Sequence, residues 1–181
     1  MTFLTGGARS GKSSLAVRRA GRTGAPVVLV ATGRADDGDA EMADRIARHR
    51  AERPPDWRTV EAPTGLVAAL RDLALDPAPD SCPTVIVDCL SLWVSNLMAR
   101  GDDEASTLEQ AHDLGRWGAA YPGTVLVVTN EVGSGIVPVH PVARDYRDRL
   151  GRVNATVARY ADLAQLVVAG RTLTLDPVEE T

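Results

Sequence analysis

The stretch TFLTGGARSGKSS, residues 2–14, decides the fold of this chain. It opens with a short apolar run, residues 3–5, which is typical of a buried strand and leads directly into a glycine-rich loop. The helical pattern of residues 12–21 follows at once. A strand, a loop with the pattern G-x-x-x-x-G-K-S and a helix in this order indicate a phosphate-binding loop in an α/β domain.

The loop residues are those that would surround a bound phosphate group: Gly6, Gly7, Ala8, Arg9, Ser10, Gly11, Lys12 and Ser13. Its glycines allow backbone N–H groups and the helix N-terminus to point at phosphate oxygens. We expect the Lys12 ammonium to reach the β- and γ-phosphates of a nucleoside triphosphate and the Ser13 hydroxyl to ligate Mg²⁺. The loop therefore predicts a nucleotide-binding protein.

Apolar, β-branched runs alternate with longer helical patterns along the rest of the chain. We expect further strands at residues 27–32, 84–88, 124–129 and 166–169. We expect further helices at residues 39–53, 64–75, 90–100, 107–120 and 142–161. Unbroken apolar runs suit strands covered on both faces, so the sheet should be mainly parallel with helices on each side. The predicted fold is a three-layer, RecA-like α/β domain of the P-loop NTPase type.

The last predicted helix carries one apolar stripe. The stripe consists of Val142, Tyr146, Leu150, Val153 and Val157, at steps of three and four residues. We expect this whole stripe to pack against the sheet.

The bulk composition limits the class of protein. The chain has 181 residues and 44% of them are apolar, which predicts a single domain over residues 1–181. The net charge of −4 argues against nonspecific binding to nucleic acids or anionic lipids. No apolar run approaches the roughly 20 residues of a membrane span, and the first strand leaves no room for a cleavable leader. We therefore expect a cytoplasmic protein.

The two cysteines, Cys82 and Cys89, lack the paired spacing of a zinc site. We expect both thiols to be reduced and buried.

Asp88 ends the apolar run TVIVD, residues 84–88. An acidic residue at the end of such a strand is the second Mg²⁺-associated element of P-loop folds, which makes Asp88 a candidate metal ligand. Asp is also a favoured N-cap residue, so Asp88 can instead cap the helix that begins near Leu90.

Three histidines occur, at positions 49, 112 and 140. His112 lies in a polar helix and His140 in a loop beside Pro141, which favours a surface position for both. His49 shares the inward stripe of its predicted helix with Met42 and Ile46. Its surroundings are rich in arginine, which fits either a buried histidine on a salt-bridged helix or an imidazole that attacks phosphorus beside charge-stabilising guanidinium groups.

Several stretches together resemble one enzyme family over nearly the whole chain. They are GGARSGKS at 6–13, EM through RI to HR at 41–50, DWRTVE at 56–61, TNEVGSGIVP at 129–138 and GRVN at 151–154. The chain resembles the bifunctional adenosylcobinamide kinase / adenosylcobinamide-phosphate guanylyltransferases of cobalamin biosynthesis. The last two stretches are more specific than the phosphate-binding loop, which many unrelated NTPases share.

The resemblance implies two reactions at or near one nucleotide site. In the first, ATP or GTP phosphorylates the aminopropanol hydroxyl of adenosylcobinamide. In the second, GTP gives its GMP moiety to the resulting phosphate, and the products are adenosyl-GDP-cobinamide and pyrophosphate. The family's guanylylated histidine lies in the helix after the second strand, and His49 is the histidine here that matches it. A covalent histidine intermediate divides the transfer into two displacements at the α-phosphorus.

The resemblance also implies the remaining ligands. The expected guanine-nucleotide contacts are Thr32, Gly33, Arg34, Arg50, Ala51, Glu52, Arg53, Glu61 and Asp88. The loop at 130–138 follows a strand end, where open α/β sheets bind ligands, and we assign it to the corrinoid side; it can equally be only a shaped turn. Family members can carry Glu at the position of Asp88. They form homotrimers, so a homotrimer is expected here.

Two other functions remain open from the sequence. A P-loop kinase for another small hydroxylated metabolite would use Lys12 but leave His49 structural. A GTP-dependent switch would need the guanine-reading motif Asn-Lys-x-Asp, and here Asn130 is followed by Glu131 instead.

Overall fold

The computed structural model describes residues 1–33, 54–75 and 82–178. The predicted helix at 39–53 lies outside the described residues, and so do His49, Arg34 and the run from Arg50 to Arg53.

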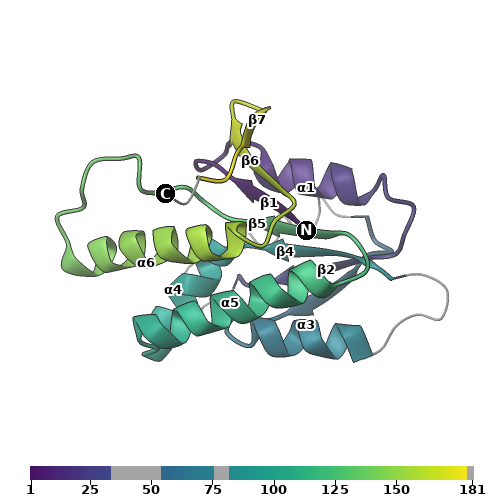
Figure 1. Cartoon of the computed structure of the whole chain (residues 1–181), viewed down its shortest axis with the longest axis horizontal. Helices are drawn as coiled ribbons and strands as arrows, with labels where there is room; N and C mark the ends of the chain where they lie inside the picture. Colours follow the sequence, from purple (N-terminus) through teal and green to yellow (C-terminus); the bar gives the residue numbers. More distant parts are fainter. Residues whose placement is uncertain (34–53, 76–81, 179–181) are drawn as a thin grey trace.

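One seven-stranded sheet runs through the molecule, in the order β3-β2-β4-β5-β1-β6-β7 (Figure 1). The strands are β1 (Thr2–Thr5), β2 (Val27–Ala31), β3 (Arg58–Glu61), β4 (Thr84–Asp88), β5 (Val125–Val128), β6 (Leu163–Val168) and β7 (Arg171–Leu175). All neighbouring strands pair in parallel except β6 and β7, which form an antiparallel hairpin. The prediction of a mainly parallel α/β sheet is therefore confirmed.

Five described helices cover this sheet: α1 (Lys12–Ala20), α3 (Leu66–Leu75), α4 (Leu90–Arg100), α5 (Glu104–Ala120) and α6 (Pro141–Ala158). Figure 1 shows α1 on one face and the other four on the opposite face. Alternate residues of the strands serve the two faces, as expected for a period of two. In β4, for example, Val85 and Val87 belong to the large core under α3 to α6, whereas Ile86 belongs to the smaller core under α1.

Both strands at the sheet edges were missed from the sequence. In β3 every residue but Val60 is exposed, and in β7 all residues are exposed. Edge strands of this kind mix polar and apolar residues. They therefore lack the continuous apolar run by which buried strands are recognised in a sequence.

Two finer predictions were wrong. Val142 is 72% exposed although Leu150, Val153 and Val157 are fully buried. The 18 residues of α6 make it about twice as long as the four-residue β5, so its first turn extends beyond the sheet. Cys82 is only partly buried, while Cys89 is buried as expected, and both thiols are free. None of the described helices combines the length and apolar character that crossing a bilayer requires.

Candidate nucleotide-binding site

The phosphate-binding loop leaves β1, the strand that lies between β5 and β6. It is held by backbone hydrogen bonds from both sides. The Glu131 N–H, just after β5, donates to the Gly6 carbonyl at 3.0 Å, and the Gly170 N–H, in the β6–β7 turn, donates to the Ser10 carbonyl at 3.1 Å. The loop is therefore fixed by segments that lie more than a hundred residues away in sequence.

Gly6 cannot be replaced without moving the backbone. A Cβ built on it would lie 2.3 Å from the carbonyl oxygen of Val167 in β6. Its φ of 152° and the φ of 97° at Gly11 also lie in the region that favours glycine. Arg9, at the apex of the loop, has a φ of 57° and is exposed. These positive φ values give the loop the tight turns that a phosphate-binding loop requires.

Lys12 lies at the start of α1 and is 7% exposed. Its ammonium donates to the carbonyl of Gly7 within the same loop at 2.9 Å. A buried ammonium directed across the loop provides the positive charge that a triphosphate needs.

Ser13, in the first turn of α1, contacts Asp88, the last residue of β4. The Ser13 hydroxyl donates to the Asp88 carboxylate at 3.4 Å, a long hydrogen bond. Cys89, not Asp88, is the N-cap residue of α4, and it makes no side-chain capping bond. Of the two sequence interpretations of Asp88, the capping role is therefore wrong. The Asp88–Cys89 peptide bond is cis.

Two further hydroxyl groups belong to this region. The side-chain oxygens of Thr5, at the end of β1, and of Ser10, in the loop, are buried and have no hydrogen-bond partner among the described residues. Buried polar groups are nearly always paired, so unpaired ones at one place are typical of a site that binds a polar ligand.

Two of the other predicted nucleotide contacts, Glu61 and Asp88, lie at the carboxyl ends of their strands. Ala31, the last residue of β2, pairs with Glu61 on one side and with Asp88 on the other. Both carboxylates therefore lie at the same level of the sheet. Asp88 contacts Ser13 at the start of α1, whereas Glu61 lies on the edge strand β3, which β2, β4 and β5 separate from β1. Glu61 is exposed at this edge.

Thr32 is buried, although a contact with nucleotide was predicted for it. Its side chain is fully buried, and its hydroxyl both donates to the Cys89 carbonyl at 2.6 Å and accepts from the Cys89 N–H at 2.8 Å. This side chain links the ends of β2 and β4. Gly33, next to it, is partly exposed.

A second polar cluster lies at the end of β5, and we call it the Asn154 cluster. Asn154, on α6, accepts from the Thr129 hydroxyl at 2.8 Å and donates to the Asn130 carbonyl at 3.0 Å. The Asn130 amide donates to the Ser91 hydroxyl at 3.0 Å, and the Tyr146 hydroxyl donates to the Ser91 carbonyl at 3.1 Å. The cluster joins β5, α6 and the first turn of α4.

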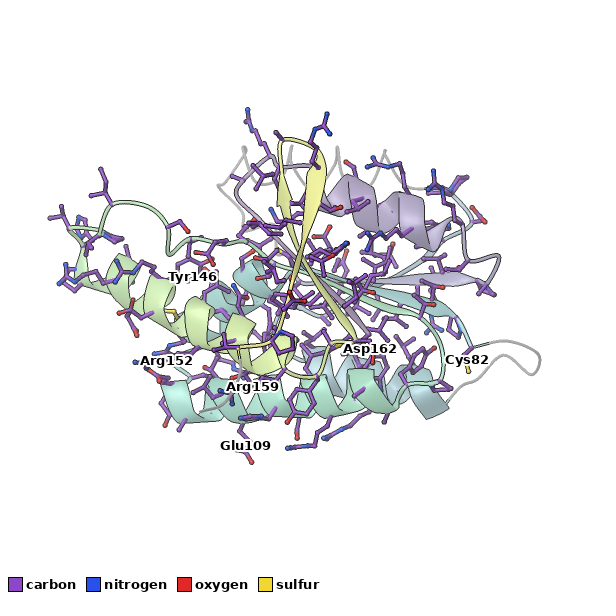
Figure 2. All side chains as sticks on the ribbon, turned by 45° about the horizontal axis from the view of Figure 1, so that its top comes forward. Cys82, Glu109, Tyr146, Arg152, Arg159 and Asp162 are labelled. Atoms are coloured by element: carbon purple, nitrogen blue, oxygen red, sulfur yellow. The ribbon has the colours of Figure 1, made fainter. Side chains whose placement is uncertain are left out.

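Two acidic protons in this region are held more tightly than usual. Burial raises the pKa of the Tyr146 hydroxyl to about 12. Burial, followed by the negative charge of Asp88, raises the pKa of the Cys89 thiol, whose sulfur lies 2.9 Å from the Ser91 hydroxyl. Figure 2 shows Tyr146 on α6 and Cys82 at the opposite end of the molecule. The Tyr146 hydroxyl and the Cys89 thiol therefore stay protonated at neutral pH, so neither is a ready nucleophile.

The other described histidines occupy peripheral positions. His112 lies 3.1 Å from the Tyr160 hydroxyl, and His140 is the exposed N-cap residue of α6. Sequence reasoning did not identify Ser91, Val167 or Gly170 as parts of the site. They belong to chain segments whose own sequence has no phosphate-binding pattern, and only the strand order brings them beside the loop.

Comparison with solved structures supports the fold. An ATPase from the type III secretion system of pathogenic bacteria matches with a TM-score of 0.55 and 11% identity, over 91% of this chain and 50% of that chain. At this identity the likeness concerns the fold alone, which is that of a P-loop ATPase.

Comparison with curated proteins supports a closer relationship. The bifunctional adenosylcobalamin biosynthesis protein CobP of Pseudomonas aeruginosa is 40% identical over 93% of this chain and 92% of its own. The bifunctional adenosylcobalamin biosynthesis proteins CobU of Salmonella typhimurium and Escherichia coli are 40% and 38% identical, each over 94% of this chain and 96% of its own. The family model described as cobinamide kinase / cobinamide phosphate guanyltransferase matches residues 2–175. The chain therefore belongs to the cobinamide kinase / cobinamide phosphate guanyltransferase family.

Proposed function

We propose that this protein catalyses two steps of adenosylcobalamin biosynthesis. It first phosphorylates adenosylcobinamide with ATP or GTP, and it then transfers GMP from GTP to adenosylcobinamide phosphate. The observation that carries the proposal is the family match over residues 2–175, together with a phosphate-binding loop in which the Lys12 ammonium is buried and directed across the loop.

The kinase step needs positioning and positive charge. The acceptor hydroxyl attacks the γ-phosphorus, the bond from the γ-phosphorus to the β,γ-bridging oxygen breaks, and ADP or GDP leaves. The charge on the transferred group lies mainly on its oxygens in a loose transition state. We assign the stabilisation of this charge to Lys12 and the loop N–H groups, and Arg9 at the loop apex is a further candidate.

Oxygen ligands suited to Mg²⁺ are present at the loop. Ser13 and Asp88 provide a hydroxyl and a carboxylate 3.4 Å apart, and no cluster of three or more His, Cys, Asp or Glu occurs within the described ranges. One carboxylate with one hydroxyl fits a Mg²⁺ ion that enters with the nucleotide and takes its other ligands from phosphates and water. When bound, it neutralises phosphate charge.

The guanylyl transfer is assigned to His49, by resemblance. The imidazole nitrogen attacks the α-phosphorus of GTP, and pyrophosphate leaves. A phosphate oxygen of adenosylcobinamide phosphate then attacks the same phosphorus and frees the imidazole. The proposed guanine-nucleotide contacts are Gly33, Arg34, Arg50, Ala51, Glu52, Arg53, Glu61 and Asp88. Thr32 is fully buried, and its hydroxyl, N–H and carbonyl are bonded to Cys89, Asp88 and Asn96, so we assign it the role of positioning the neighbouring Gly33.

The resemblance also supports the wider setting. We propose that one folded unit over residues 1–181 carries both reactions, and that it acts as a cytoplasmic homotrimer.

The deciding experiment follows the two labels of GTP. The protein is incubated with Mg²⁺ and either α- or γ-labelled GTP, denatured and assayed for bound label. We expect α-label in an acid-labile phosphoramidate and no γ-label. His49→Ala should abolish the adduct, and His140→Ala, which changes the exposed N-cap residue of α6, should retain it.

Each other outcome decides between functions. Full α-label on the His49→Ala protein would contradict the covalent assignment. If the parent protein binds no label but transfers γ-label to a small hydroxylated acceptor, it is a P-loop kinase without guanylyl transfer. An unlabelled protein that only hydrolyses GTP slowly would indicate a switch protein.

A further inference from the structure

We propose that the loop between β5 and α6 binds the corrin ring of the acceptor through an exposed apolar surface. This surface, which we call the aliphatic shelf, consists of Ile136, Val137, Val139 and Val142. The inference rests on the proposed function, since it names where that reaction's acceptor lies. The carboxyl-side position of the loop is shared with other α/β proteins, but the shelf is a property of this chain's own structure.

The shelf is unusually apolar for an exposed segment. Ile136, Val139, Val142 and Val137 are 97%, 91%, 72% and 58% exposed. Residues 132–143 contain no Asp, Glu, Lys or Arg, although 24% of the whole chain is charged. Aliphatic side chains gathered in one exposed loop are typical of a surface that binds a ligand or a partner.

Hydrogen bonds hold the shelf in place at both ends. The Arg144 guanidinium donates to the carbonyls of Pro138 at 3.1 Å and of Val139 at 2.6 Å. At the other end, the Glu131 carboxylate accepts from the Gly133 N–H at 2.5 Å. The Asn154 cluster fixes the base of the loop. A loop with fixed ends presents its aliphatic groups in a defined arrangement, which reduces the entropy that a ligand must overcome on binding.

The shelf is continuous with the phosphate-binding site. The Glu131 N–H, where the loop begins, donates to the Gly6 carbonyl of the phosphate-binding loop. Figure 1 shows the segment leaving β5 beside that loop and extending past the first turn of α6. An acceptor with its hydroxyl at the γ-phosphate can therefore place the rest of its structure along the shelf.

The chemistry of the acceptor matches an uncharged shelf. A corrin is a large, nearly flat macrocycle with hydrocarbon faces, and its rim in cobinamide carries neutral amides. Burying such a ring against aliphatic groups is favourable, whereas charged side chains there would lose hydration. The exposed aliphatics of β7 differ, because Leu173 alternates with polar Thr172 and Thr174 on an edge strand. Leu173 therefore serves as a control.

The test compares steady-state kinetics of four proteins: the parent, Ile136→Asn, Ile136→Leu and Leu173→Asn. Both substituted side chains, Ile136 and Leu173, are exposed, so the three variants should fold. We expect kcat/KM for adenosylcobinamide to fall about tenfold or more in Ile136→Asn. Ile136→Leu and Leu173→Asn should stay within about twofold of the parent. The KM for GTP and the yield of α-labelled adduct should be unchanged in all four.

The outcomes separate this inference from the proposed function. If the parent protein modifies no corrinoid, the proposed function itself is wrong. An active parent with unchanged corrinoid kinetics in Ile136→Asn, and in Val139→Asn as a second variant, would overturn the shelf alone. A change of molecular mass by light scattering in those variants would assign the surface to a second copy of the chain and would also overturn it.

Discussion

Two polar regions lie next to each other at the carboxyl edge of the sheet, and they are built differently. At the phosphate-binding loop, Lys12 bonds to a carbonyl of its own loop, the Ser13–Asp88 contact is long at 3.4 Å, and two neighbouring hydroxyls are buried without partners among the described residues. In the Asn154 cluster, four hydrogen bonds of 2.8 to 3.1 Å join three elements.

The difference separates a binding site from its support. The unpaired hydroxyls of Thr5 and Ser10 retain hydrogen-bonding capacity for a ligand, whereas a satisfied network fixes the elements around it. We therefore expect substitutions at the loop to reduce activity more than stability, and substitutions in the Asn154 cluster to do the reverse.

The largest effect is expected from Lys12→Met. Methionine keeps an apolar stem in the buried position and removes only the charge. Both the kinase and the guanylyl transfer rates should fall by about 10²- to 10³-fold, the usual cost of losing one preorganised donor to transition-state charge. Steady-state assays of both reactions measure the loss, and urea unfolding should show a smaller stability change than for Asn154→Ala. Near-normal activity would mean that the loop does not hold the phosphates.

The second effect, on stability, is expected from Asn154→Ala. It leaves the Thr129 hydroxyl and the Asn130 carbonyl without a partner, and each unpaired buried group costs about 1–3 kcal/mol. Urea unfolding should show a total loss of about 2–4 kcal/mol, and Thr129→Val combined with it should cost less than the sum of both.

The activity of the folded Asn154→Ala protein sharpens the same comparison. We expect it to stay within about tenfold of the parent. Unchanged stability with lost activity would reverse the assignment and place the Asn154 cluster in the binding site.

The smallest effect is expected at alkaline pH, from Tyr146. Because burial raises its folded pKa from the ordinary value of 10.0 to about 12, the neutral hydroxyl contributes stability that is fully present below pH 10. That contribution is lost as the pH rises from 10 towards 12, since the unfolded chain ionises first. Unfolding curves of the parent and Tyr146→Phe should converge over this range. Parallel curves would show that the hydroxyl is not held as the structure indicates.

The central strands could be predicted from sequence because burial on both faces forces continuous apolar residues. Runs such as TVIVD, residues 84–88, therefore marked β4 with its correct bounds. The edge strands could not be found in this way, since one side of β3 and of β7 meets water and tolerates Arg, Thr and Glu. The first turn of α6 was placed against the sheet because periodicity identifies a helical face but not where the neighbouring strand ends.

The phosphate-binding loop was predictable because its pattern is local. The contacts that hold it were not, since Val167 and Gly170 meet Gly6 and Ser10 only through the position of β1 between β5 and β6. The motif at 151–154 marked Asn154 as notable without revealing its partners. The capping interpretation of Asp88 could be excluded only when the structure placed Cys89 at the N-cap position.

The position of β1 has a consequence for the order of events during folding. The loop at residues 6–13 precedes its supports by more than a hundred residues, since β5 ends at Val128 and β7 begins at Arg171. Pairings that span most of the chain form slowly. The loop therefore acquires its full backbone support only late in folding, after the segments around Glu131 and Gly170 have reached it.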